Sequence, residues 1–198
     1  SEMCIRDRYY LSKNVVDQVL TDPQELQLGG KKARCTVLFS DIRGFTTISE
    51  QLDAKALSEL LNEYLTPMTN VVFNNNGTLD KYMGDAIMAF FGAPIEHDNH
   101  AVEGCYTALE MMEELAVLQE GWAKSGTFSL DVGIGLNTGD MSVGNMGSRI
   151  RFDYTVMGDN VNLGSRLEGI NKEYRTNIII SESTFEGAKD FIHAREMD

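Results

Sequence analysis

The chain has 198 residues, of which 42% are hydrophobic and 24% charged, the composition of an ordinary globular domain and not of a disordered segment. Its formal net charge of −13 argues against nucleic acid as a partner, because a polyanion is bound through a basic surface. No apolar run approaches the ~20 residues of a membrane span, so we expect no direct membrane insertion and a cytoplasmic location, although a parent protein could carry membrane or sensor domains.

The three cysteines, Cys4, Cys35 and Cys105, are odd in number and widely spaced, with no CxxC or Cys/His pairing. This pattern disfavours both a disulfide framework and a zinc site, so we expect buried or incidental thiols. The histidines show no ligand spacing either. We expect all three at the surface: His97, His100 and His193.

The first 30 residues are expected to precede the folded domain. Residues 1–8 show no periodicity and are interpreted as tag or junction residues. Residues 9–30 predict a connector made of a short helix and a turn, because Pro23 and Gly29–Gly30 follow the helical stretch. The domain itself is expected over residues 31–198.

Strand and helix patterns alternate from residue 34 onward. The apolar run Cys35–Ser40 predicts a strand, and leucines at helical spacing predict a helix over Asp53–Phe73. Two short runs, Thr78–Met83 and Ala86–Phe91, predict a β-hairpin around Gly84 and Asp85. Residues 98–123 predict a second long helix.

The second half of the domain predicts a further strand pair, a helix and a last strand. Apolar residues alternate over 130–136, and a strand over 141–146 is expected to pair back on it. After residues 151–157 a helix begins, with Asp159 as its expected N-cap, and Ile178–Ile180 predicts another strand. This order indicates a mixed α/β sandwich with helices packed on one sheet. Four glycines are expected to serve turns and close packing: Gly133, Gly135, Gly139 and Gly144.

Two aspartates lie at positions suited to binding a metal ion, one at a strand end and one at a hairpin tip. Asp41 ends an apolar strand and is followed by a turn into a helix, where it could cap that helix or hold a cation while Gly44 lets the backbone approach an anion. Asp85 lies at the tip of the predicted hairpin. Two carboxylates can bridge two hard cations about 3.5 to 4 Å apart, the arrangement used in displacement at phosphorus. Plain turn chemistry explains Asp85 equally well, and the spacing alone leaves both interpretations open.

Three ordered segments resemble the class III adenylate and guanylate cyclase catalytic domain: Phe39–Thr46, Lys81–Ala86 and Tyr154–Glu168. The resemblance extends from about Leu11 to the end of the chain. It implies an α/β (α+β) fold, a ferredoxin-like mixed sheet with helices packed on it. It also implies an enzyme of signal transduction that converts ATP to 3′,5′-cyclic AMP and pyrophosphate.

The resemblance implies a role for each matching residue. Asp41, the Ile42 carbonyl and Asp85 would hold two divalent cations, Mg²⁺ or Mn²⁺. The turn that follows would contact the phosphates through Gly44, Phe45 and Thr46, whose helix N-terminal amides suit an anion.

Lys81 and Thr155 fall on the purine-reading positions of the family. Lysine can donate to adenine N1, and the threonine hydroxyl can accept from the 6-amino group, whereas guanine-reading members usually carry glutamate at the lysine position. The pair therefore resembles the Lys/Thr subgroup of bacterial adenylate cyclases. Outside this motif, Lys81 would be a solvated strand lysine and Thr155 an ordinary β-forming residue.

Asn162 and Arg166 match the transition-state pair of the family. They are four residues apart on the predicted helix and so share one face. In the family, asparagine orients the ribose and arginine neutralises charge growing on the α-phosphate. Arg151, or alternatively Arg149, would contact phosphate.

The resemblance also implies a head-to-tail homodimer, with metal aspartates from one chain and base-reading and transition-state residues from the other. Relatives continue into strands carrying a lysine that contacts the triphosphate, whereas this chain stops at Asp198, so we expect a C-terminally truncated catalytic domain. Guanylate cyclase and a non-catalytic nucleotide-binding dimerisation module stay open as alternatives. A diguanylate cyclase is disfavoured, because Ala86-Ile87 follows Gly84-Asp85 where a GGDEF-type turn is required.

Overall fold

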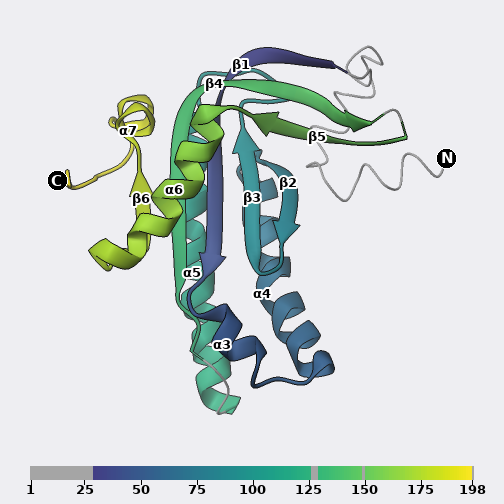
Figure 1. Ribbon diagram of the computed structural model, residues 1–198. Coiled ribbons are helices and arrows are strands. Elements are labelled where there is room, and N and C mark those ends of the chain that lie inside the picture. Colours follow the sequence, from purple (N-terminus) through teal and green to yellow (C-terminus); the bar gives the residue numbers. More distant parts are fainter. Residues whose placement is uncertain (1–28, 126–128, 149, 198) are drawn as a thin grey trace.

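The computed structural model describes residues 29–125, 129–148 and 150–197, which form one twisted sheet with helices on both faces (Figure 1). The predictions for residues 1–28, including the connector helix and Cys4, lie outside this part. In chain order the elements are β1 (Gly29–Ile42), α3 (Phe45–Ser49), α4 (Ala54–Asn74), β2 (Thr78–Met83), β3 (Ala86–Phe91), α5 (His100–Ser125), β4 (Val132–Ser148), β5 (Arg151–Met157), α6 (Asp159–Tyr174), β6 (Ile178–Ile180) and α7 (Glu182–Ala188).

The sheet has the strand order β2-β3-β1-β4-β5, with β6 added beside β4. β6 runs parallel to β4, and every other pairing is antiparallel, so the sheet is mixed. The longest pairing joins β1 to β4, from Gly29 opposite Asn145 to Ile42 opposite Val132. The predicted fold class, a mixed sheet covered by helices, is confirmed.

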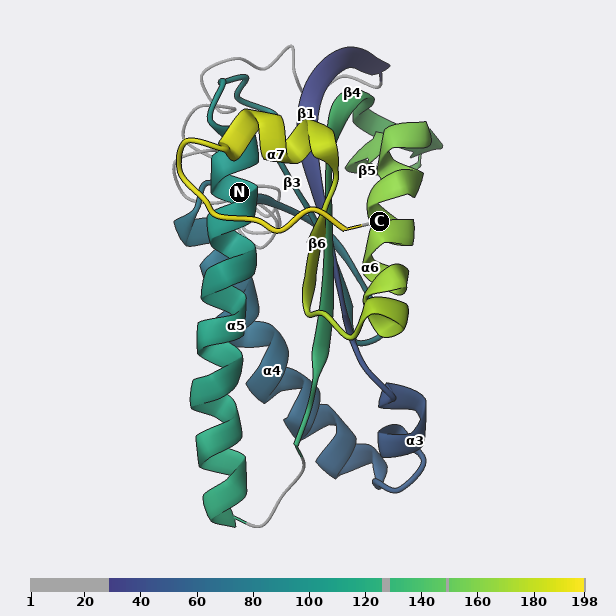
Figure 2. The same cartoon turned by 90° about the vertical axis from the view of Figure 1, so that its left-hand side faces the viewer.

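The helices cover the two faces unequally. Figure 2 shows the sheet nearly edge-on, with α4 and α5 on one side and α6 on the other. β1 alternates between two cores, because Leu38 packs toward the α4 and α5 side while Val37 and Phe39 pack toward the other side. A large core therefore lies under α4 and α5, where Tyr64 is fully buried. A second core lies on the opposite face of the sheet, beside α6, and includes residues of β5.

One strand assignment was wrong. Residues 130–136 and 141–146 do not form a hairpin; most of both segments belongs to the single strand β4, whose hairpin partner is β5. Asn137 to Asp140 looks like a turn because its residues are polar or glycine. Other segments of the same chain instead form hydrogen bonds with these residues. β1 pairs across the whole segment, and the Asn137 amide donates to the Asn160 carbonyl at 2.8 Å.

The start of α6 differs from its prediction by one position. Asp159 is the first residue of the helix, and Gly158 is its N-cap with φ 135°. A carboxylate in the first turn still suits the positive end of the helix dipole. α7, which follows β6 and packs against α5, was not predicted.

The surface position predicted for His100 was also wrong. Its ring is buried, and Nδ1 lies 2.8 Å from the Thr36 hydroxyl. That hydroxyl continues a buried chain through Thr138 to Thr184 at 2.7 and 2.9 Å. The ring also packs over Gly92, but its hydrogen-bond partner Thr36 lies 64 positions away, a contact that local spacing does not reveal. The thiols of Cys35 and Cys105 are buried and free, as predicted.

Glycines on β4 let α6 lie directly on the sheet. A Cβ atom on Gly135 would meet the backbone nitrogen of Glu168 at 2.2 Å, and one on Gly139 would meet the Asn160 side chain at 2.4 Å. The structural role predicted for these two glycines is therefore confirmed. The close approach sets the distance between α6 and the strand that it covers.

We expect Gly135→Ala to destabilise the fold, because its methyl group would push the α6 backbone off the sheet. Overpacking of this kind costs about 1–3 kcal/mol, measured as a lower free energy of unfolding in urea. Gly169→Ala is the matched control, since a Cβ there meets nothing within 4 Å. In the helix interior it should be neutral or stabilise by up to about 1 kcal/mol. Equal effects of the two substitutions would contradict this account of α6 packing.

Candidate active site

Two carboxylates meet at the end of β1. β1 ends at Ile42, and its pairing with β3 brings the β2–β3 turn beside that end, since Ser40 lies opposite Ile87. The Asp85 carboxylate in this turn accepts a hydrogen bond from the Ile42 backbone N–H, with Oδ2 3.1 Å from the nitrogen. The Asp41 carboxyl group contacts the Asp85 carboxyl group. Residues 44 positions apart in sequence thus form one acidic pair.

The environment of this pair disfavours two negative charges. Burial, as the larger cause, and the adjacent Asp41 carboxyl group together raise the pKa of Asp85 to about 7. A divalent cation between the two groups would remove the repulsion. Within the described residues no group of three or more His, Cys, Asp or Glu side chains gathers as a metal site. Two carboxylates nevertheless fit Mg²⁺, which is commonly bound by one or two carboxylates together with substrate phosphates.

The turn after Ile42 has the backbone shape that its glycine permits. Gly44 has φ 69° and precedes the short helix α3 as its N-cap. Phe45 is half-buried against the core under α4 and α5, whereas Thr46 is exposed. The side chain of Phe45 therefore anchors the turn to this core, and Thr46 faces solvent.

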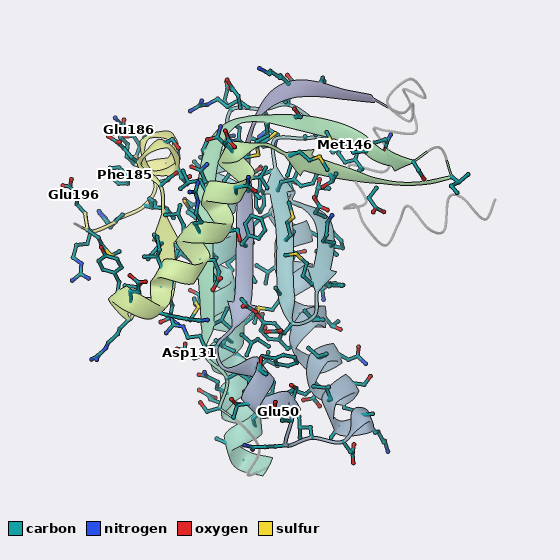
Figure 3. All side chains as sticks on the ribbon, viewed as in Figure 1. Glu50, Asp131, Met146, Phe185, Glu186 and Glu196 are labelled. Atoms are coloured by element: carbon teal, nitrogen blue, oxygen red, sulfur yellow. The ribbon has the colours of Figure 1, made fainter. Side chains whose placement is uncertain are left out.

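Arg43 ties this turn to the segments that precede β4 and β6 at the same end of the sheet. Its Nη1 donates to Asp131 Oδ2 at 2.8 Å, its backbone N–H donates to the Asp131 carbonyl at 2.8 Å, and its Nη2 donates to the Thr176 carbonyl. Asp131 immediately precedes β4 and is labelled in Figure 3. Sequence analysis did not single out Arg43 for this role, and local spacing carried no signal for it.

Tyr64 of α4 supports the acidic pair from the core side. Its hydroxyl lies 3.3 Å from the Ser40 hydroxyl, one residue before Asp41. Burial raises the pKa of Tyr64, the Ser40 hydrogen bond lowers it, and the charges of Asp85 and Asp41 add to the rise. The hydroxyl therefore stays neutral and fills the space behind the carboxylates.

A second polar cluster joins the two predicted purine-reading residues. Thr155 on β5 is buried, and its hydroxyl donates to Asp80 Oδ2 at 2.5 Å. Lys81 Nζ lies 3.3 Å from Asp80 Oδ1. The Asp80 side chain is fully buried and that of Lys81 is 44% exposed, so the ammonium group lies at the surface above the carboxylate. The structure thus brings Lys81 and Thr155 together through a residue that the sequence analysis missed.

Asp80 carried a signal that could have identified it. It is an acidic residue inside an apolar strand pattern, directly beside a candidate site residue, and buried carboxylates are rare unless paired.

The remaining predicted site residues lie apart from both clusters. Asn162 and Arg166 are both exposed on α6, as the four-residue spacing predicted. In the described part of the chain no hydrogen bond or ion pair joins either of them to Asp41, Asp85 or Lys81. Arg151 is the first residue of β5. The Arg151 side chain and residue 149 lie outside the described part of the structure.

This arrangement matches a known domain family. The model of the adenylate and guanylate cyclase catalytic domain matches residues 30–196. The chain belongs to this family. It is therefore a class III nucleotidyl cyclase domain, and members of this family are lyases that typically use divalent metals.

Relatives and solved structures agree with the family assignment. The chain is 36% identical to adenylate cyclase 1 of Rhizobium meliloti strain 1021 over 172 residues, and 38% identical to adenylate cyclase of Anabaena cylindrica over 162 residues. These alignments cover 85% and 81% of this chain but only 26% and 32% of the relatives. This cyclase domain thus spans about a quarter to a third of their length.

Solved structures of both nucleotide specificities are similar to this domain. The adenylyl cyclase CyaB from P. aeruginosa matches with a TM-score of 0.78 and 40% identity, covering 85% of this chain and 86% of that chain. The guanylyl cyclase Cya2 matches with a TM-score of 0.78 and 38% identity, covering 85% of each chain. Overall similarity therefore does not separate the two specificities. None of the helices described in the structure is long and apolar enough to span a membrane.

The raised pKa of Asp85 predicts a pH-dependent effect of Asp85→Asn on the metal-free domain. Between 3.8, its ordinary value, and about 7, the folded state holds the Asp85 proton more tightly than the unfolded chain. Stability from this group therefore falls as pH rises through that window. At pH 8 we expect Asp85→Asn to raise the melting temperature by about 2–4 °C, a value reduced for the half-exposed position of the carboxyl group.

Thermal unfolding at pH 5 and pH 8 measures this difference. At pH 5 the difference should be clearly smaller than at pH 8, because pH 5 lies low in the window between 3.8 and about 7 and only part of the loss has then occurred. At pH 8, Mn²⁺ should raise the melting temperature of the wild type and leave that of Asp85→Asn nearly unchanged. An equal difference between the two proteins at both pH values would contradict the shifted pKa.

Proposed function

We propose that this chain is the catalytic domain of an adenylate cyclase that converts ATP to 3′,5′-cyclic AMP and pyrophosphate in signal transduction. The observation that carries the proposal is the Asp41–Asp85 pair, two carboxylates held together at a strand end where a divalent cation would relieve their repulsion. In the proposed reaction the ribose O3′ forms a bond to the α-phosphorus, the bond to the pyrophosphate oxygen breaks, and the hydroxyl proton leaves to solvent.

The proposed roles follow the chemistry of each side chain. Asp41, Asp85 and the Ile42 carbonyl would hold two Mg²⁺ or Mn²⁺ ions. Such ions, when bound, lower the pKa of the ribose hydroxyl and stabilise the leaving pyrophosphate. The backbone from Gly44 to Thr46 would hold phosphate oxygens, supported by the left-handed conformation of Gly44.

The transition-state residues are proposed on α6. Asn162 would orient the ribose, and Arg166 would neutralise charge growing on the α-phosphate. Arg151 at the start of β5 is proposed as a further phosphate contact. Because nucleophile and phosphorus belong to one molecule, the protein mainly folds its substrate into a reactive conformation.

A head-to-tail homodimer is the proposed assembly. Asn162 and Arg166 are exposed, and large apolar side chains are exposed close in sequence to the purine cluster: Tyr82, Met83 and Met157. Exposed apolar surface of this kind supports a protein partner. In a symmetric dimer, each site would take its metal aspartates from one chain and Lys81, Thr155, Asn162 and Arg166 from the other.

Adenine is the proposed base. Lys81 can donate to the ring nitrogen N1, and Thr155 can accept from the 6-amino group. The adenylate cyclases among the relatives support this choice. Guanylate cyclase is the second candidate, favoured by the structural similarity to the guanylyl cyclase Cya2. A non-catalytic nucleotide-binding module is the third and would bind nucleotide without forming product.

The direct test is formation of cyclic nucleotide from ATP and from GTP, with Mg²⁺ and with Mn²⁺. We expect kcat/KM for ATP to exceed that for GTP by at least about tenfold. Asp41→Asn and Asp85→Asn should each lower kcat by about 100-fold or more, since each removes a proposed metal ligand. Asp53→Asn is the matched control. Asp53 caps α4 from an exposed position, and its substitution should leave kcat within about twofold of the wild type.

Full activity of either metal-site variant would contradict the two-metal assignment. A preference for GTP would select the guanylate cyclase candidate. Nucleotide binding without product, even after prolonged incubation with Mn²⁺, would select the non-catalytic module.

Mixing two inactive variants tests the shared site. Asp85→Asn and Arg166→Ala should each be nearly inactive alone. After random reassociation half of the dimers are mixed, and each mixed dimer has one intact site of two, so roughly a quarter of wild-type activity should return. Cyclic AMP formation in the mixture measures this recovery. No recovery, with mixed dimers demonstrated by two affinity tags, would contradict the head-to-tail arrangement.

A further inference from the structure

A bulge in β2 turns two consecutive charged side chains to the same face. Leu79 pairs with Ala89 and Lys81 pairs with Met88, so two steps along β2 correspond to one step along β3. Asp80 is the extra residue. In a regular strand Asp80 and Lys81 would point to opposite faces, whereas a bulge re-aims one of them. This is why Lys81 Nζ can lie 3.3 Å from the carboxylate of its own neighbour.

The Asp80 carboxylate is held from several sides. Its Oδ2 accepts the hydrogen bond of the Thr155 hydroxyl, and the Val156 backbone N–H also donates to the carboxylate. Oδ1 has no hydrogen-bond partner among the described residues and is balanced by the Lys81 ammonium group. Burial raises the pKa of Asp80 overall, and Thr155, Lys81 and Val156 offset part of this rise by favouring the ionised form.

The direction of the Thr155 hydrogen bond follows from this chemistry. The Thr155 hydroxyl donates to Asp80 Oδ2, and the Lys81 ammonium group 3.3 Å from Oδ1 favours the ionised carboxylate, which can only accept. The single hydroxyl hydrogen of Thr155 therefore points to Asp80. The remaining lone pairs of the hydroxyl oxygen can then only accept a hydrogen bond from a ligand. A 6-aminopurine presents a donor to such an oxygen, whereas a 6-oxopurine presents an acceptor and would leave two acceptors facing each other.

The same carboxylate sets the position of Lys81. An ammonium group has three donors, and Asp80 engages one side of it. The other donors stay available to a ring nitrogen that carries no hydrogen, as N1 does in adenine. N1 of guanine carries a hydrogen and would oppose the lysine. Both contacts therefore discriminate in the same direction.

We propose that Asp80 is a positioning residue that determines purine specificity: it fixes Thr155 as an acceptor and Lys81 as a donor toward the base, and so selects 6-aminopurine nucleotides. This inference rests on the proposed function, because it concerns the base that the same site would bind. Asp80 itself does not touch the nucleotide and acts through the two residues that it holds.

The test compares Asp80→Asn with the wild type in two assays. One is the ratio of kcat/KM for ATP to that for GTP. The other, which needs no turnover, is displacement of a fluorescent ribose-labelled ATP by unlabelled ATP or GTP. An amide offers both a donor and an acceptor, so Thr155 is no longer confined to accepting from the base. We expect the ATP preference to fall by about tenfold in both assays.

Thr155 variants test whether the effect passes through the hydroxyl. Thr155→Val should lower the preference by a similar factor, and Thr155→Ser, which keeps the hydroxyl, should retain it. Asp80→Asn combined with Thr155→Val should fall no more than about twofold below Asp80→Asn alone, because both remove one interaction. Asp153→Asn is the charge-matched control. It removes one negative charge at an exposed position on β5, the strand that carries Thr155, and should leave the preference unchanged.

A melting curve for each variant separates misfolding from altered specificity. If Asp80→Asn has no cooperative transition, Thr155→Asn tests the same idea with Asp80 intact. Asp80 should then draw the amide N–H₂ group, leave the amide oxygen toward the base, and preserve the ATP preference. A loss of preference in a folded Thr155→Asn protein would overturn the proposal.

Two further results would also overturn it. One is an unchanged ATP preference in folded Asp80→Asn, and the other is an equal loss in Asp153→Asn. These outcomes are distinct from failure of the proposed function. A wild-type domain that forms no cyclic nucleotide refutes the adenylate cyclase assignment, while the displacement assay still decides the role of Asp80.

Discussion

The antiparallel pairing of β1 with β4 is the interaction on which the rest of the structure depends. All 14 residues of β1 have a partner on β4, and together the two strands form the centre of the sheet. The end of β1 carries Asp41, and its other edge holds β3, which brings Asp85 to the same point. β4 in turn carries the glycines that seat α6 and continues into the hairpin with β5. Both clusters of the candidate site are therefore positioned by one ladder of backbone hydrogen bonds.

The two clusters differ in how their charges are balanced. At Asp41 and Asp85, two carboxyl groups lie in contact, and burial together with the Asp41 carboxyl group raises the pKa of Asp85 to about 7. At Asp80, a buried carboxylate is compensated by the Lys81 ammonium group and by two hydrogen-bond donors from β5. The first cluster therefore gathers negative charge, whereas the carboxylate of the second is compensated by a cationic side chain. This contrast supports metal binding at the acidic pair and recognition of an uncharged base at Asp80.

Several site features were predictable because they depend on local pattern. The helical spacing of Asn162 and Arg166 predicted two exposed side chains on one face, and the hairpin around Gly84 and Asp85 follows from two short apolar runs. The three ordered motifs were also sufficient to identify the family, which the comparisons confirm. The roles of the individual site residues remain predictions, because local sequence pattern does not reveal how a metal ion or a nucleotide is bound.

The sequence by itself determined most of the strands and helices, the family and the candidate residues, because periodicity and short sequence motifs are properties of neighbouring residues. The tertiary structure decided which of these residues contact one another, since it places both Lys81 and Thr155 against the Asp80 carboxylate. The role of Asp80 depends on the bulge that turns Lys81 to its side and on β5, which brings Thr155 against it. The continuous β4 and the buried His100 were decided in the same way. In each case the deciding partner lies tens of residues away, and only the folded chain brings its hydrogen-bonding group within reach.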